Sequence, residues 1–182
     1  MMMSRGQRVG MTVLTIAVFF SLLWVSLHHD PHRLKSALIG KTVPVFQADD
    51  IAGKPLNQTL FYGKITVLNV FASWCDTCAV EHVFWINRSM PSDVQLVALD
   101  YMDSPEKAAE FLKDHGNPYD VVISDPKGKL GIDFGVYGVP ETYLIDQAGV
   151  IRFKRVGVVT SNQWKQVWLP RIRSLEVSHA ST

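Results

Sequence analysis

The amino-acid sequence predicts an α/β protein, a three-layer sandwich built around a mixed sheet and preceded by one membrane-spanning helix. Two apolar runs, Ile65–Phe71 and Val94–Tyr101, indicate buried strands, and a helical segment follows each of them. Residues 141–146 and 150–155, joined by a three-residue turn, predict an antiparallel hairpin. This order of elements predicts a sheet that is parallel early and antiparallel toward the carboxyl end.

The composition limits the kinds of partner. The chain has 182 residues and a formal net charge of +1, with 19% charged and 47% hydrophobic residues. This length suits one domain plus an anchor. A nearly neutral chain has no strong attraction for nucleic acid, so we expect no nucleic-acid partner.

The first residues predict a membrane anchor. Val9–Leu27 contains nineteen residues without a charge, and as a helix this stretch spans about 28 Å, close to the hydrocarbon core of a bilayer. Arg5 and Arg8 precede it, and positive charges before a span place the amino end in the cytoplasm. We therefore expect a single-pass protein of the inner membrane with its catalytic domain in the periplasm. The expected parts are a cytoplasmic tail at 1–8, a transmembrane signal anchor at 9–27, a tether at 28–39 and the domain at 40–182.

A cleaved signal peptide is the alternative to an anchor. Such a peptide has a shorter apolar core and a cleavage site of small residues. Trp24 and the leucines before it do not suit that site, although Val25–Leu27 leaves the alternative open.

Local signals predict the remaining elements. Residues 40–46 should begin the domain as an extended edge segment, because Pro44 cannot donate to a strand ladder. Gly53–Leu56 fits a turn or hairpin connection. Ser104 suits a helix cap, with Pro105 at the first helical position. The other expected elements are a helix at 75–87, a strand at 121–123, a helical turn at 130–134 and a closing helix at 162–173.

The two cysteines carry the candidate chemistry. Cys75 and Cys78 are the only cysteines, and they follow the first buried strand at the start of a predicted helix. A helix amino end offers partial positive charge and free N–H donors, which favour a thiolate over a thiol. Cys75 is therefore the expected nucleophile, and Cys78, one turn on, can then attack it and close a disulfide. The spacing predicts a redox switch.

Two other uses of the cysteines need weighing. A structural disulfide would close a very short loop and gain little from it. A metal site could take Cys75, Cys78 and His82 from one helix, but a structural zinc ion wants a fourth ligand. Cu(I) suits soft sulfur ligands, so a copper-binding assembly factor stays as an alternative function. We otherwise expect no metal and no cofactor.

Two segments, Asn69–Cys78 and Gly135–Thr142, resemble the CcmG/DsbE family, the membrane-anchored thioredoxin-like proteins of cytochrome c maturation. The resemblance extends from the anchor to Trp168. It implies a thioredoxin-like fold with an added hairpin near the amino end and an insert in the middle.

The resemblance also implies a function and partners. It implies a periplasmic thiol–disulfide oxidoreductase that acts as a reductant on apocytochrome c or on its haem-ligation chaperone. Electrons would come from a transmembrane thiol carrier of the DsbD or CcdA type. A general extracytoplasmic thiol reductase is the alternative within the same chemistry. A thiol peroxidase is a further alternative, but its second cysteine usually lies far away in sequence.

Three residues beside the cysteines are expected to support the site. Trp74 should pack over the active-site loop and limit access to the sulfurs, with simple core filling as the alternative. Asp76 stands where the family commonly has Pro, and its carboxylate should raise the pKa of the Cys75 thiol unless solvent screens it. Pro140 should be a cis proline beside the disulfide that exposes the Val139 backbone to a substrate strand, rather than a trans turn proline.

Two glutamates complete the candidate site. Glu81 lies one helical turn beyond Cys78 and could move the proton of Cys78, because Asn69 stands where thioredoxins carry a buried Asp. A surface glutamate is the equally open alternative. Glu141 follows Pro140 and is expected to make the groove acidic, so that with Asp76 it selects basic or partly unfolded partners. We expect no catalytic role for His82.

Overall fold

The computed structural model describes residues 5–27 and 37–180, and the chain divides into two units, 1–34 and 35–182. In the first unit, α1 (Arg5–Leu27) is one continuous helix. Among the helices within the described ranges, α1 has the length and apolar composition needed to cross a membrane. The predicted anchor at 9–27 lies within α1. Residues 1–4 of the predicted tail and 28–36 of the predicted tether lie outside the described residues.

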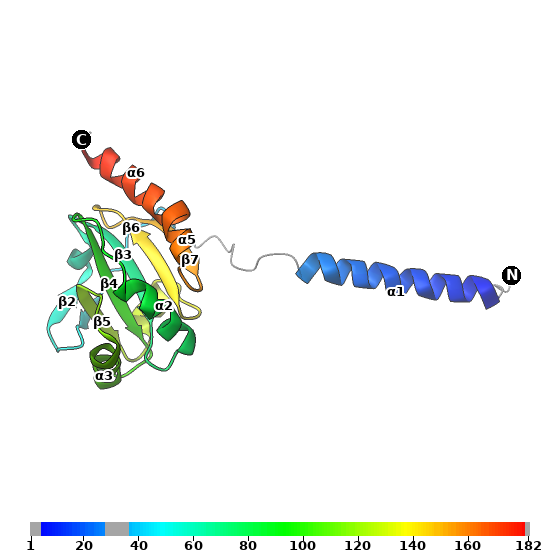
Figure 1. Cartoon of the computed structure of the whole chain (residues 1–182), viewed down its shortest axis with the longest axis horizontal. Helices are drawn as coiled ribbons and strands as arrows, with labels where there is room; N and C mark the ends of the chain where they lie inside the picture. The colour runs from blue at the N-terminus through cyan, green and yellow to red at the C-terminus, as the bar shows by residue number, and fades with distance from the viewer. Residues whose placement is uncertain (1–4, 28–36, 181–182) are drawn as a thin grey trace. The chain divides into compact units, whose positions relative to one another are not determined.

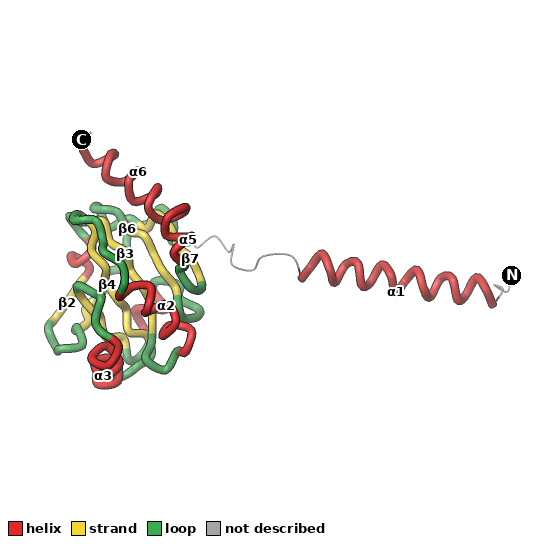
Figure 2. Tube along the Cα trace, viewed as in Figure 1, coloured by secondary structure: helices red, strands yellow, loops and turns green. Residues whose placement is uncertain are grey.

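A five-stranded mixed sheet forms the centre of the second unit (Figures 1 and 2). The strand order is β5–β4–β3–β6–β7. β3 runs parallel to β4, and β4 runs parallel to β5, whereas β6 and β7 add antiparallel strands on the other side of β3. The predicted α/β fold with a mixed sheet is therefore confirmed. The strands are β3 (Ile65–Phe71), β4 (Val94–Tyr101), β5 (Val121–Asp125), β6 (Glu141–Ile145) and β7 (Ile151–Val156).

The central strand β3 determines where the site lies. All seven of its residues are buried, as expected for an apolar strand covered on both faces. At its carboxyl end, Val70 pairs with Glu141 of β6 and Phe71 pairs with Asp100 of β4. The loop that leaves β3 therefore emerges between the first residue of β6 and the end of β4.

Helices cover both faces of the sheet and complete three layers. One face packs against α2 (Asp76–Ile86), α3 (Pro105–His115) and the carboxyl-terminal helical segment, and Figure 1 shows α2 lying across that face. The other face packs against the short helices η2 (Gln58–Phe61) and α4 (Lys129–Asp133).

Aromatic rings fill the core between α2 and the carboxyl-terminal segment. The Trp85 and Trp164 rings meet edge to face with centroids 5.7 Å apart, and Trp164 stacks on Trp168 at 6.2 Å. All three side chains are almost fully buried. Large aromatic surfaces of this kind contribute much of the hydrophobic stabilisation of a domain.

Three local predictions can be compared with the structure. The hairpin β1 (Gln47–Asp49) and β2 (Pro55–Asn57) is present, as the family resemblance implied. Within the expected extended edge segment at 40–46, residues 40–43 pair with residues 149–151 through three backbone hydrogen bonds and a bridge between Thr42 and Val150, and β1 begins at Gln47. The closing helix is longer than 162–173, because α5 (Ser161–Gln163), a π-helical turn (Trp164–Trp168) and α6 (Leu169–Ala180) follow one another without a break.

Candidate active site

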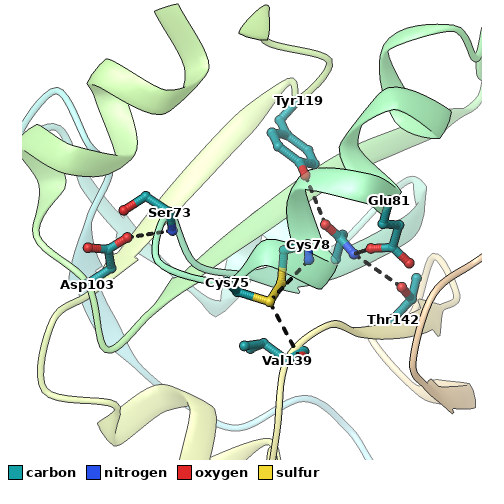
Figure 3. The surroundings of a disulfide bond; sticks show 9 residues. Ser73, Cys75, Cys78, Glu81, Asp103, Tyr119, Val139 and Thr142 are labelled. Atoms are coloured by element: carbon teal, nitrogen blue, oxygen red, sulfur yellow. Dashed lines mark hydrogen bonds between the residues drawn. A yellow bond between two sulfur atoms is a disulfide. The ribbon is translucent and has the colours of Figure 1, made fainter. Parts of the chain in front are cut away.

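The two cysteines lie at the junction of β3 and α2 and form a disulfide with a Cα–Cα distance of 5.2 Å (Figure 3). Cys75 is the N-cap of α2, and its sulfur accepts a hydrogen bond from the Cys78 N–H at 3.1 Å. A residue in this position faces the free N–H groups of the first helical turn. The predicted pairing and the predicted place at the helix start are both observed.

The two sulfurs differ in surroundings. Cys75 is 8% exposed and Cys78 is 3% exposed, so the first cysteine is the more accessible one. The Cys75 sulfur lies 3.7 Å from the carbonyl oxygen of Val139. The Val139–Pro140 peptide is cis, as predicted, and Figure 3 shows Val139 beside the sulfur pair. The backbone of the loop before β6 thus borders the disulfide directly.

A buried polar network lies behind Cys78. Glu81 is 1% exposed, and its two carboxylate oxygens accept hydrogen bonds from the Val159 N–H at 2.6 Å and from the Asn69 amide at 2.7 Å. Asn69 also donates to Thr142 at 3.2 Å and accepts from the Tyr119 hydroxyl at 2.9 Å. Glu81 is therefore an interior residue, and the alternative of a surface glutamate is wrong.

Burial controls the protonation of this network. Desolvation raises the pKa of Glu81 above its ordinary value, although the hydrogen bonds from the Val159 N–H and from Asn69 act in the opposite direction. Burial and the charge of Glu81 together raise the pKa of Tyr119. Glu81 is thus a carboxyl group that can hold a proton at a higher pH than a solvated glutamate can.

The expectation that Glu141 makes the groove acidic is wrong. Its carboxylate is fully buried and forms an ion pair with Lys154 at 2.8 Å, while the Tyr143 hydroxyl donates to the same oxygen at 2.8 Å. Lys154 also donates to the Gly135 carbonyl oxygen at 2.8 Å and lies over the Tyr137 ring. The pair neutralises Glu141 because a buried carboxylate needs a compensating cation. Glu141 therefore anchors the segment before Pro140 from inside.

Trp74 and Asp76, on either side of Cys75, are both exposed. Trp74 is 57% exposed, and its indole N–H donates to the Met102 carbonyl oxygen at 3.1 Å. It therefore does not fill the core, and the hydrogen bond attaches it to the turn that follows β4. Asp76 occupies the first turn of α2, where a carboxylate interacts favourably with the helix dipole.

His82 does not join the cysteines in a metal site. Its Nε2 lies 2.9 Å from the Gly116 carbonyl oxygen, its ring packs against Phe111, and burial lowers its pKa. Across residues 5–27 and 37–180, no three His, Cys, Asp or Glu side chains are grouped in a way that could hold a metal ion. The ligand set that the copper alternative needs is therefore not assembled.

A cavity of about 710 Å³ lies elsewhere in the domain, between the β1–β2 hairpin, the edge of β5 and α4. Asp49, Glu106 and Lys129 are among the residues that line it, and neither cysteine does. The disulfide is therefore not part of this cavity.

Comparison with known proteins agrees with this site. The Redoxin family model matches residues 38–167. The thiol:disulfide interchange protein DsbE of Vibrio cholerae is 46% identical over 143 residues, which cover 78% of this chain and 77% of that protein. DsbE of Escherichia coli K12 is 38% identical over 165 residues, covering 85% and 86% of the two chains. The chain belongs to the DsbE family of thiol:disulfide interchange proteins.

A solved structure supports the same assignment. The crystal structure named for a DsbE protein of Chlorobium tepidum superposes with a TM-score of 0.63 at 26% identity, covering 75% of this chain and 96% of that one. Membership of the DsbE family and the Cys75–Cys78 disulfide make this protein a thiol–disulfide oxidoreductase with a thioredoxin-like fold.

Sequence reasoning missed Lys154, Tyr119 and the contacts of the turn after β4. The predicted hairpin carries a signal for Lys154. Lys154 pairs with Tyr143 across β6 and β7, and Glu141 lies two residues before Tyr143 on the same face of β6, within reach of the lysine. Tyr119 gave no local signal, since its partner Asn69 lies fifty residues away along the chain.

We predict that Glu81→Gln changes how stability depends on pH. The folded protein keeps the Glu81 proton at a pH where the unfolded chain has already lost it. The stabilisation from this carboxyl is therefore complete below its ordinary pKa and is lost as the pH rises through the raised pKa of the folded state. Between the pKa of Glu81 in the unfolded chain and its pKa in the folded protein, the free energy of unfolding falls by at most about 1.4 kcal/mol per pH unit. Urea unfolding of the full chain in detergent from pH 4 to pH 9 should show the wild type losing stability relative to Glu81→Gln. Exposed Glu110→Gln serves as the control, and a constant difference would contradict the prediction.

Proposed function

We propose that this protein is a periplasmic reductant in cytochrome c maturation that reduces disulfides of apocytochrome c or of its haem-ligation chaperone. The observation that carries the proposal is the Cys75 sulfur, capped on α2 and bordered by the Val139 backbone beside a cis Pro140. The cytochrome c substrate rests on the resemblance of Gly135–Thr142 and Asn69–Cys78 to the CcmG/DsbE family.

In the proposed cycle, Cys75 is the nucleophile. The Cys78 N–H, which lies 3.1 Å from the Cys75 sulfur, stabilises the thiolate in the reduced protein. The thiolate attacks a partner disulfide, forms a mixed disulfide and releases one partner thiolate. Cys78 then loses its proton and attacks Cys75, so that the second partner thiolate leaves and the partner gains two electrons. A transmembrane thiol carrier of the DsbD or CcdA type returns the protein to the dithiol form.

Other residues have positioning roles in this proposal. Pro140 and Val139 present a backbone edge to the substrate strand, and Trp74 borders the approach to Cys75. Asp76 places a negative charge beside Cys75, which disfavours the thiolate and makes the couple more reducing. Glu141 supports the site through the fold, because its ion pair with Lys154 holds the segment before Pro140.

The proposed location follows from α1 and the charges before it. Arg5 and Arg8 favour a cytoplasmic amino end, with α1 as a single-pass inner-membrane anchor. In this arrangement residues 1–8 are the cytoplasmic tail, 9–27 the anchor, 28–39 the tether and 40–182 the periplasmic catalytic domain.

Glu81 is the proposed proton acceptor for Cys78. Its raised pKa and its place one turn beyond Cys78 suit a group that takes the thiol proton during the second attack. Glu81→Gln should therefore slow release of the mixed disulfide by roughly 10²-fold, the lower range for loss of a general base, and leave its formation nearly unchanged. Stopped-flow measurement of both steps with a disulfide-bonded model peptide would check this. Equal slowing of both steps would contradict the assignment.

Trapping should identify the substrate. Cys78→Ala leaves Cys75 able to form a mixed disulfide but removes the thiol that resolves it. Expressed as the full chain in cells that assemble cytochrome c, this variant should capture apocytochrome c or its thiol chaperone, and Cys75→Ala should capture neither. Mass spectrometry of the trapped adducts is the measurement. A set of unrelated envelope proteins would indicate a general extracytoplasmic reductase instead.

The equilibrium potential should identify the direction of electron flow. Redox equilibration of the full chain in detergent with glutathione should give a value near that of thioredoxin, roughly −270 mV, and Asp76→Asn should raise it. A value near −120 mV would make the protein an oxidant and would contradict the proposed reductant role.

A further inference from the structure

A second group of buried carboxylates lies at the carboxyl ends of β4 and β5, outside the Glu81 network. Asp100, Asp103 and Asp125 are each at most 6% exposed. Asp100 pairs in register with Phe71, the last residue of β3, and β3 leads directly to the cysteines. These carboxylates are therefore close along the sheet to the loop that carries Cys75.

The turn after β4 contacts that loop twice. A carboxylate oxygen of Asp103 accepts a hydrogen bond from the Ser73 N–H at 2.6 Å, as Figure 3 shows. The neighbouring Met102 carbonyl oxygen accepts from the Trp74 indole at 3.1 Å. Two consecutive residues of the turn thus bind the two residues that precede Cys75.

The turn is built for these contacts. The other oxygen of Asp103 accepts from the Ser104 N–H at 2.8 Å, so both carboxylate oxygens are engaged. Met102 has a φ of 52°, in the left-handed region that a non-glycine residue seldom adopts, and its N–H donates to the Asp125 carbonyl oxygen at 3.0 Å. Such a backbone conformation persists only where the surrounding structure holds it.

Asp100 is a buried carboxylate that interacts electrostatically with Asp103. Among the described residues no N–H or hydroxyl donor reaches its oxygens, and burial raises its pKa to about 8, followed by the charge of Asp103, a side-chain hydrogen bond with Asp103 and the charge of Asp125. Its register partners on the neighbouring strands, Phe71 and Ser124, do not titrate. A protonated Asp100 leaves the buried negative charge on Asp103, where the Ser73 N–H binds it.

We propose that Asp103 is a positioning residue of the redox site, which holds the Ser73 backbone and so sets the place of the Cys75 sulfur at the amino end of α2, with Asp100 as its buried neighbour. The proposal rests on thiol–disulfide exchange at Cys75. A charge-assisted hydrogen bond to a backbone N–H is stronger and shorter than a neutral one, so it can fix the loop two residues before the sulfur. The position of the sulfur relative to the Cys78 N–H then depends on Asp103.

Positioning and simple charge repulsion predict opposite outcomes. If Asp103 acted only through its negative charge, its removal would stabilise the thiolate, and Asp103→Asn and Asp103→Ala would both react faster. If it positions the loop, Asp103→Ala should slow alkylation of Cys75 roughly tenfold, in line with loss of a hydrogen bond to a charged group. Asp103→Asn, which keeps an acceptor oxygen, should then recover much of the wild-type rate.

The test uses the reduced full chain in detergent micelles. Iodoacetamide alkylation of Cys75 is followed by mass spectrometry from pH 5 to pH 10, with exposed Asp114→Ala as the matched control. Equal rates in the wild type and Asp103→Ala, or faster rates in both Asp103 variants, would overturn the proposal. If wild-type Cys75 itself did not react, the exchange function would fail instead, so the two failures are distinguishable. Should Asp103→Ala not fold, a rate for Asp103→Asn at or above that of the wild type would overturn the proposal, and a reduced rate would support it.

Asp100 is tested in the oxidised full chain, where no thiol titrates. The amide chemical shift of Ser73, followed by NMR, should change with a midpoint near the Asp100 pKa of about 8 in the wild type. In Asp100→Asn, which is neutral at every pH, that transition should disappear. A wild-type Ser73 amide that does not titrate in this range, or the same transition in the variant, would contradict the role given to Asp100.

Discussion

The pairing of β3 with its two neighbours is the constraint on which the rest of this structure depends. β3 is buried on both faces, so its register on β4 and β6 is held by packing as well as by hydrogen bonds. That register brings three segments to one end of the sheet: the loop with the cysteines, the segment before Pro140 and the turn after β4. A slip of one residue would turn every β3 side chain to the opposite face, and Asn69 would no longer meet Glu81.

Four buried carboxylates contact or pair with residues 69–73, which lead to the disulfide, and the protein compensates each in a different way. Glu141 has a cation, Lys154, at 2.8 Å. Glu81 accepts two N–H hydrogen bonds and has a raised pKa, so that it can also exist as the neutral acid. Asp103 is held by two backbone N–H groups, whereas burial and the charge of Asp103 raise the pKa of Asp100 to about 8. Burying a charged group costs free energy, and these four arrangements show how one domain can keep buried carboxyl groups near a reactive sulfur.

Much of the fold followed from local patterns. The runs Ile65–Phe71 and Val94–Tyr101 became strands with the predicted bounds, because continuous apolar, β-branched segments are stable only when both faces are covered. The Ser104 cap is present as predicted and accepts the Lys107 N–H. The expected edge segment at 40–46 pairs with residues 149–151 only through residues 40–43, because an extended segment depends on a partner strand for its hydrogen bonds.

The sequence by itself determined that two thiols meet at a helix start, because their spacing and the strand before them are local properties. It also determined the apolar stretch that forms α1. Only the tertiary structure decided the partners of the polar groups around the site: Glu141 binds Lys154, His82 binds the Gly116 carbonyl oxygen, and Asp103 binds the Ser73 N–H. The physical reason is that burial and partners far along the chain set the protonation state and the contacts of a side chain. Neither the burial nor the distant partners can be read from the neighbouring residues in the sequence.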